Sequence, residues 1–359
     1  MTASEVRTNP FISVMPHFEE DRSRYIIRDF HRNRSYEIPN YGLLGLLGEA
    51  SEWIEREELK VLAEQKHELS KEAAESVVEM LESKNILASP DSEVFDLERE
   101  RKQWEEFGWG VAFDYYVCIR DYPYYDDNDS ESILERVVKR SERHGPPPAL
   151  YKEYEDVPRV ELGEVDDDET LESIATVLAE DGRKPTRNES TVDAETLSEV
   201  LFYSFGETGR QTLEGVGEFL LKTSPSGGSR HPTEAYVAVL DVDGIERGVY
   251  HYSVKEHGLE RIGTAKGVVE SLRRATGSTP SFVVVFTSVL ARDMWKYRDP
   301  RAFRIPNHDV GHLMETFRLV CVATDLNVMF EQEFDKQQLA AELEIDRLTE
   351  PILVCASVY

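Results

Sequence analysis

The sequence predicts a mixed helix-and-strand protein, with a small helical module followed by a larger segment in which helices and strands alternate. Two features of the larger segment support this prediction. Phe282–Phe286 is a continuous apolar run, which is typical of a strand buried on both faces. Asp309–Thr324 places apolar side chains at helical spacing, so one side of this helix is expected to face the core. The smaller module is indicated by three short helical stretches beside short strands.

Residues 1–98 are predicted to form the first domain. Side chains alternate at Tyr25–Ile27 and again through Tyr36–Ile38, which predicts a pair of strands. Ser70 is a suitable N-cap for a helix that Asn85 ends. Three helices are expected in this domain, at Tyr41–Ala50, Glu55–Gln65 and Ser70–Asn85. Three short helices beside small strands suggest a winged-helix-like module.

Residues 99–165 are predicted to be an aromatic-rich connecting segment of less regular structure. A helix is expected over Ser130–Arg143, and Gly145–Pro148 would end it. Residues 166–359 form the third predicted segment. Its other helices and strands are expected at Thr170–Ala179, Ala194–Phe205, Glu234–Leu240, Val249–Tyr252 and Ile352–Val358.

The charge balance excludes two classes of partner. Lys and Arg number 41 and Asp and Glu 70 among 359 residues, which gives a net charge of −29. Such a surface repels nucleic acid and anionic membrane, so neither is expected as a partner. Many acids with few lysines are also typical of proteins adapted to high salt, where self-repulsion is screened. A halophilic source is therefore expected, with an ordinary acidic protein as the alternative.

The sequence lacks the usual targeting and metal-binding patterns. No apolar run reaches the roughly 18 residues of a membrane helix, and the first residues lack a signal-peptide core, so a cytoplasmic protein is expected. Cys118, Cys321 and Cys355 lie far apart inside apolar runs, which argues against a disulfide framework. His308 and His312 are one helical turn apart but lack a third ligand, so a structural role is expected rather than a metal site.

The loop Thr223–Glu234 is the most informative stretch for function. Adjacent glycines at Gly227 and Gly228 allow the backbone to approach a flat or anionic ligand. Arg230 adds a guanidinium that suits phosphate or carbonyl oxygens. On composition alone, such a loop is more often an ordinary glycine-rich turn than a ligand-binding loop.

Two further stretches carry candidate chemistry. Gly182–Arg187 holds three cations, which suit a phosphate, although alone it reads more simply as a solvated basic loop. Arg292–Arg301 places Lys296 and Tyr297 beside Trp295, as in an acid–base pair next to an aromatic surface. A nearby cation is expected to lower the pKa of such a tyrosine. The alternative is an amphipathic surface loop.

Taken in order, these stretches resemble the FMN-dependent nitroreductase superfamily, and within it the SagB/ThcOx-type dehydrogenases of ribosomal-peptide modification. The resemblance covers residues 166–359. It rests on five motifs in family order: Gly182–Arg187, Ser224–Tyr236, Arg247–Tyr252, Trp295–Arg298 and Asp309–His312. The N-terminal module resembles, more weakly, the winged-helix elements that dock leader peptides as an added strand. The alternative for that module is a helical dimerisation arm.

The resemblance implies an α+β, three-layer α/β/α sandwich and a homodimer that holds FMN at the subunit interface. It implies a precursor-peptide substrate whose thiazoline or oxazoline rings are oxidised to thiazoles or oxazoles, with cyclodehydratase-type partner proteins. Lys296 and Tyr297 would remove a ring proton while hydride passes to FMN. The implied FMN-binding residues are Arg183, Lys184, Arg187, Pro225, Ser226, Gly227, Gly228 and Arg230.

The chain departs from the family pattern at several positions. Pro185 stands where the family has serine, and four polar residues stand where it has glycines near the flavin. These four are Asp325, Asn327, Gln332 and Glu333. Two alternatives therefore stay open beside the azoline dehydrogenase. One is a flavin-dependent reductase of dehydroamino acids or of small nitro or quinone compounds. The other is a non-catalytic, peptide-binding scaffold subunit of a modification complex.

Overall fold

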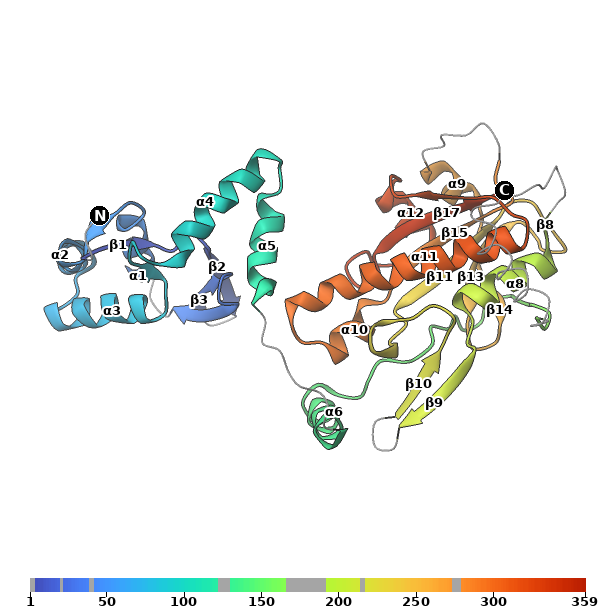
Figure 1. The fold of residues 1–359 in the computed structure, drawn as a ribbon, viewed down its shortest axis with the longest axis horizontal. Helices are drawn as coiled ribbons and strands as arrows, with labels where there is room; N and C mark the ends of the chain where they lie inside the picture. Colours follow the sequence, from blue (N-terminus) through green and yellow to red (C-terminus); the bar gives the residue numbers. More distant parts are fainter. Residues whose placement is uncertain are drawn as a thin grey trace. The chain divides into compact units, whose positions relative to one another are not determined.

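The computed structural model describes residues 4–19, 22–38, 42–121, 130–165, 192–213, 217–272 and 279–359. The chain divides into two compact units, Met1–Tyr125 and Asp126–Tyr359 (Figure 1). Each unit has its own hydrophobic core, so each is described by itself.

The first unit combines two small sheets with five helices among its described residues. The sheets have the strand orders β5-β1-β6 and β2-β3-β4. Its elements are β1 (Glu5–Thr8), β2 (Ile12–Glu19), β3 (Arg22–Asp29), β4 (Arg34–Ile38), α1 (Gly42–Glu49), β5 (Ile54–Glu55), α2 (Arg56–His67), α3 (Lys71–Ser83), β6 (Leu87–Ala88), α4 (Glu93–Glu106) and α5 (Gly110–Arg120).

The expected elements of this unit are present. In the predicted strand pair, Tyr25 lies opposite Ile38 in neighbouring strands. Ser70 caps α3, because its hydroxyl accepts a hydrogen bond from the Ala73 amide at 3.2 Å. Asn85 ends that helix in a left-handed conformation with φ 58°. The assignment of the unit to the winged-helix class remains a prediction.

Two helices, α4 and α5, occupy a stretch that the sequence predicted to be irregular. The boundary expected at residue 98 falls inside α4, and the compact unit continues to Tyr125. The reason lies in the aromatic residues, which pack the two helices against each other. The ring of Trp104 lies 5.2 Å from that of Phe113 and stacks at 5.8 Å on Tyr116. These rings belong to a core and not to a connection.

The second unit contains a seven-stranded sheet with the order β16-β17-β15-β11-β13-β14-β7. Every neighbouring pair in this sheet is antiparallel. The fold is therefore α+β, as expected. The strands of the sheet are β7 (Arg159–Glu161), β11 (Thr233–Val239), β13 (Gly248–Ser253), β14 (Gly258–Gly263), β15 (Phe282–Ser288), β16 (Val328–Glu331) and β17 (Ile352–Val358).

Helices cover both faces of this sheet. Along β11, Val237 points to the layer that contains α8 (Ala194–Phe205) and α11 (Ile305–Ala323), and Tyr236 points to the opposite layer. That opposite layer contains α9 (Lys266–Ser271) and α12 (Lys336–Glu342). The arrangement is a three-layer sandwich, and Figure 1 shows α8 and α11 lying over one face. Every residue of β15 is buried, as its apolar run predicted.

The smaller elements of the unit frame the sheet. They are α6 (Ser130–His144), β8 (Val192–Asp193), β9 (Gly209–Leu213), β10 (Gly217–Leu221), β12 (Val242–Asp243) and α10 (Leu290–Lys296), with 3-10 turns at Gly227–Ser229 and Pro300–Arg304. The predicted helix at Thr170–Ala179 lies outside the described residues.

The chain between residues 145 and 165, expected to be a connection, belongs to this second unit. Strand β7 pairs with β14 and forms one edge of the sheet. The Lys152 ammonium binds Glu350 Oε2 at 2.6 Å, and Glu350 also accepts the hydroxyls of Tyr236 and Thr287 at 2.9 and 2.8 Å. A buried carboxylate with these partners fixes the segment to the sheet.

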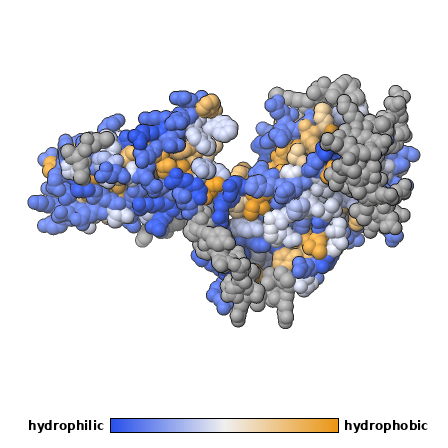
Figure 2. All heavy atoms as spheres, viewed as in Figure 1, coloured by the Kyte–Doolittle hydropathy of each residue, from blue (hydrophilic) through white to orange (hydrophobic). Residues whose placement is uncertain are grey.

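The surface agrees with the charge of the chain. Figure 2 shows a face on which hydrophilic residues dominate, with apolar residues in smaller groups. Within the described ranges, no helix joins the length of a membrane span to a sufficiently apolar sequence. The three cysteines are free and buried.

Candidate functional site

The glycine-rich loop between β10 and β11 takes an unusual backbone path. Gly228 has φ 61°, and Ser229 and His231 also lie in the left-handed region at 55° and 43°. Glycine adopts this conformation without strain, whereas the other two residues need local hydrogen bonds to hold them there. The Ser229 hydroxyl supplies one such bond, since it donates to Leu220 O at 2.7 Å.

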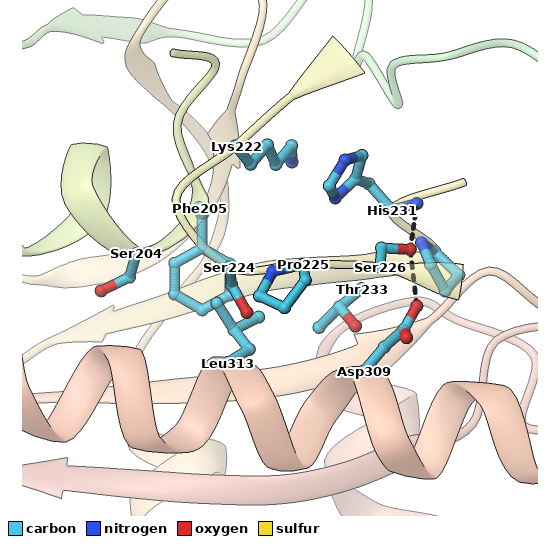
Figure 3. Close-up of a pocket in the computed structure, with 11 residues that line it drawn as sticks. Ser204, Phe205, Lys222, Ser224, Pro225, Ser226, His231, Thr233, Asp309 and Leu313 are labelled. Carbon is cyan, nitrogen blue, oxygen red and sulfur yellow. Dashed lines mark hydrogen bonds between the residues drawn. The ribbon is translucent and has the colours of Figure 1, made fainter. Parts of the chain in front are cut away.

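Asp309 of α11 holds the start of this loop. Its carboxylate accepts the Ser226 hydroxyl at 2.6 Å and the Gly227 amide at 3.0 Å. Ser226 Oγ in turn accepts the His231 amide at 2.9 Å, so one hydroxyl joins both ends of the turn. Figure 3 shows Ser226 between Asp309 and His231, with both bonds drawn. The loop is therefore rigid before any ligand arrives.

Helix α10 delivers Lys296 and Tyr297 to the same glycine. The Lys296 ammonium donates to Gly228 O at 3.2 Å, and Arg230 Nε donates to the same oxygen at 3.2 Å. A β-carbon at Gly228 would overlap both Lys296 Nζ and Tyr297 Oη. The two side chains therefore converge on Gly228, where no β-carbon is in their way.

A buried ion network anchors α10 to the sheet. Arg292 Nη1 binds Glu234 Oε1 at 2.6 Å and also donates to His231 O at 2.9 Å. His251 bridges Glu234 and Glu260 at 3.1 and 2.9 Å. Burial would raise the pKa of Glu234, but the charges of Arg292 and His251 outweigh it and bring that pKa to about 2. Glu234 is thus ionised at neutral pH and holds the helix in place.

Tyr297 keeps its proton at neutral pH. Burial raises the pKa of its hydroxyl, and the neighbouring Asp293 carboxyl raises it further, against the opposing charge of Arg230. Arg230 lowers this pKa, as the sequence led us to expect of a cation, but burial and Asp293 outweigh it, so the expected net decrease is wrong. The Tyr297 hydroxyl is a hydrogen-bond donor, not a phenolate.

Asp293 is the least satisfied acid in the site. Its side chain is 3% exposed, and among the described residues neither carboxyl oxygen has a hydrogen-bond partner. Burial, followed by the like charge of Asp309, raises its pKa to about 7. A carboxyl with this pKa can hold or release a proton near neutrality.

A cavity of about 390 Å³ lies beside Lys296. Its walls come from α6, from Pro147–Leu150, from β10 and from α10. Trp295 closes one side, and its indole N–H donates to Gly145 O at 3.0 Å. Lys296 and Arg230 both line the cavity and both donate to Gly228 O of the glycine loop.

The model of the nitroreductase family matches residues 184–358. These residues form a nitroreductase-family domain. Trifolitoxin-processing protein TfxB of Rhizobium leguminosarum bv. trifolii is 31% identical over 216 residues, covering 56% of this chain and 57% of that protein. A nitroreductase-like protein of Methanocaldococcus jannaschii is 28% identical over 153 residues, covering 42% of this chain and 73% of that protein.

A nitroreductase-like crystal structure from Anabaena variabilis superposes with a TM-score of 0.48 at 22% identity, covering 63% of this chain and 46% of that one. The alignment with the trifolitoxin-processing relative covers little more than half of that protein's length, at 57%.

The nitroreductase domain brings together most of the predicted site residues. Gly228, Arg230, Lys296 and Tyr297 meet at one point. Pro225, Ser226 and Gly227 lie on the same loop, where they also line a small pocket or bind Asp309. The predicted phosphate-binding residues Arg183, Lys184 and Arg187 lie outside the described residues.

Three residues at this site were not among the candidates of the sequence analysis: Asp293, Arg140 and Asp309. Asp293 lies inside the stretch examined for Lys296 and Tyr297, but only its buried, unpartnered state marks it. Arg140 reaches the site from a helix some 150 residues earlier in the chain, so spacing could not reveal it. Asp309 was visible only as part of a family motif. Within the described residues no cluster of potential metal ligands occurs.

The polar replacements of family glycines lie on the surface of the domain. Asp325, Asn327, Gln332 and Glu333 are exposed and flank strand β16 at the edge of the sheet. Asp325 keeps a glycine-like conformation with φ 60°, just after the last residue of α11. The Leu326 amide closes the helix there by donating to Cys321 O at 2.7 Å.

We therefore predict that Asp325→Gly is more stable than Asp325→Ala by about 1 kcal/mol. Both variants lack the carboxylate, so their difference reports only the cost of a β-carbon in the left-handed conformation. Urea unfolding of the two variants measures it. Equal midpoints would show that this turn relaxes out of the left-handed region.

Proposed function

We propose that the nitroreductase domain is an FMN-dependent oxidoreductase that acts on a ribosomally made peptide and dehydrogenates thiazoline or oxazoline rings. The observation that carries the proposal is the convergence of Lys296 and Tyr297 on Gly228. This places two proton-handling groups directly against the backbone of the glycine loop, which the proposal puts beside the ring of FMN.

The residues present fit FMN. At Gly228 the Lys296 ammonium and the Tyr297 hydroxyl occupy the place that a β-carbon would take, so glycine lets these two groups come close to the loop backbone. Gly227 is equally restricted, because a β-carbon there would overlap the Ile305 side chain. Arg230 supplies a half-buried cation beside this surface. Pro225 and Ser226 would complete the loop under the flavin.

The phosphate of FMN needs cations, and the proposal assigns that role to Arg183, Lys184 and Arg187. Their sequence pattern supports this assignment. A second subunit would complete the site, in line with a homodimer.

When bound, FMN supplies a two-electron acceptor for hydride. Conversion of an azoline to an azole removes two hydrogens, and the protein has to take the one that leaves as a proton. The raised pKa of Tyr297 keeps its hydroxyl protonated, so Tyr297 donates a hydrogen bond and orients the substrate. We assign the ring proton to Lys296 Nζ, which has to give up one proton and become the neutral amine before it can accept it. Asp293, with a pKa of about 7, stands one helical turn earlier and can exchange that proton onward.

A peptide substrate is supported by the sequence resemblance and by similarity to a trifolitoxin-processing protein. Cyclodehydratase-type partner proteins and recognition of a leader peptide by the first unit belong to the same proposal. The alternative of a non-catalytic scaffold draws on the four lost glycines. The exposed positions of those residues, away from the Lys296–Tyr297 pair in sequence, weigh against it.

The spectrum of the purified protein tests the proposal directly. We expect FMN to be bound or taken up at about one per chain, with release on denaturation measured by visible absorption. Gly228→Ala should weaken FMN binding at least tenfold, because the new β-carbon meets Lys296 and Tyr297 and the backbone is left-handed.

Gly244→Ala is the matched control. Gly244 also has a positive φ of 83°, but a β-carbon there would meet only Ala194 Cβ, at an ordinary 3.5 Å. It should retain FMN as the unmodified protein does. A protein that stays colourless with added FMN refutes the flavoenzyme and favours the scaffold.

A further inference from the structure

The cavity beside Lys296 contains cations that the rest of the protein leaves unpaired. Arg140 and Arg230 both line it, and among the described residues neither guanidinium forms an ion pair. Arg230 uses its Nε for Gly228 O. In a chain of net charge −29, acids are abundant enough to pair surface arginines. Other described arginines without an ion pair, such as Arg247 and Arg298, are exposed to solvent, whereas Arg140 and Arg230 are half-buried in one cavity.

These guanidiniums are also partly desolvated. Burial lowers the pKa of Arg140, and the like charges of Arg298 and Arg136 lower it further. Burial likewise lowers the pKa of Arg230. Glu218 also lines the cavity, but it pairs with Arg210 at 3.5 Å, and the charge of Asp293 offsets only part of the effect of burial on Arg230. An anion entering the cavity would therefore be stabilised by both guanidiniums.

The walls of the cavity are flat as well as charged. Arg140 lies 5.6 Å from the ring centre of Trp295, and Arg230 lies 4.9 Å from that of Phe219. Pro147 and Pro148 add rigid apolar surface on the α6 side. Two aromatic rings in the lining favour a planar ligand, and a guanidinium beside each ring can bind an anionic group that such a ligand carries.

We infer that this cavity binds a planar ring that carries a carboxylate, with the ring against Trp295 and Phe219 and the carboxylate at Arg140 and Arg230. Lys296 lies at the wall of the cavity, next to the ring. That this ligand is the substrate of the flavin reaction rests on the proposed function. It then names the substrate class: a heterocycle in a peptide whose neighbouring group is an acidic side chain or a terminal carboxylate.

The test compares two probes of nearly the same shape, of which one carries a negative charge and the other is neutral. Binding of 4-nitrobenzoate and of 4-nitrobenzamide to the full chain is measured by titration calorimetry at one ionic strength, with and without saturating FMN. The acid should bind at least tenfold more tightly than the amide, because an arginine–carboxylate hydrogen bond is charge-assisted. Arg140→Met keeps the apolar stem and should lower the affinity for the acid about tenfold, with little change for the amide.

Lys139→Met is the matched control on the same helix. The Lys139 side chain is 72% exposed and pairs with Glu135 at 3.0 Å, so the substitution removes a charge that lies outside the cavity. It should leave both affinities unchanged.

Three results overturn the inference: equal binding of acid and amide to the unmodified protein, equal losses in the Lys139 and Arg140 variants, or displacement of the probe by FMN. The last would assign the cavity to the cofactor. The first comparison needs no variant, so it holds even where Arg140→Met does not fold. A preference for the acid in a protein that takes up no FMN would refute the proposed function and leave the binding site standing.

Discussion

Replacing Lys296 by Met and Tyr297 by Phe together should slow oxidation of a thiazoline ring by a factor of about 10²–10⁴ while FMN stays bound. The variant removes the proton acceptor and the hydrogen-bond donor, but it leaves the glycine loop and its bonds to Asp309 intact. The measurement is mass spectrometry of a synthetic peptide with one thiazoline, which loses two hydrogen atoms on oxidation. Flavin content is followed by absorption.

Single variants separate the two roles. Tyr297→Phe should lower the rate of thiazoline oxidation less than Lys296→Met does, because the buried hydroxyl keeps its proton and serves to orient the ring. Lys266→Met is the control for loss of a lysine, since its side chain is 83% exposed on α9. Undiminished turnover in the double variant, with flavin bound, would remove both residues from the mechanism.

Asp293→Asn should change how the stability of the domain depends on pH. The native carboxyl has a pKa of about 7, against an ordinary value of 3.8. Between these values the folded state holds a proton that the unfolded state has released, so the free energy of unfolding falls as pH rises. From pH 5.5 to pH 8.5 the loss attributable to Asp293 is about 2 kcal/mol. Asparagine does not titrate, so the variant should lack this decline.

The quantity to measure is the difference between variant and unmodified protein at the two pH values, from urea unfolding in constant salt. Any fixed cost of burying an amide cancels in that comparison. Asp241→Asn, at an exposed position, is the control and should leave the pH dependence unchanged. If Asp293→Asn also leaves it unchanged, the native carboxyl is already ionised at pH 5.5 and has a partner.

Elements with a strong repeating pattern could be predicted from sequence, and those built from a few residues could not. The apolar run of β15 and the helical spacing of α11 are clear in the chain and confirmed in the fold. The hairpin β9–β10 has no alternation of apolar and polar residues in either of its strands, so no strand was predicted there. Strand β7 has three residues and forms only because β14 offers it an edge.

The site divides in the same way. The loop at Gly228 and the Lys296–Tyr297 pair belong to sequence motifs, so both could be predicted. The structure shows that they are in contact. The raised pKa of Asp293 depends on burial without a hydrogen-bond partner among the described residues, and no sequence motif indicates such burial. The direction of the Tyr297 pKa could not be read from sequence, because burial and Asp293 outweigh the cation that the motif shows.

Strand β17 lies between β15 and β16, yet it follows both in the chain. As the ribosome makes the protein, β15 and β16 therefore emerge before the strand that pairs with each of them. Until residues 352–358 appear, β15 presents a long apolar edge, which is the kind of surface on which nascent chains associate. The charge of −29 keeps such unfinished chains apart. The acidic composition thus protects the protein during synthesis, before the sheet is complete.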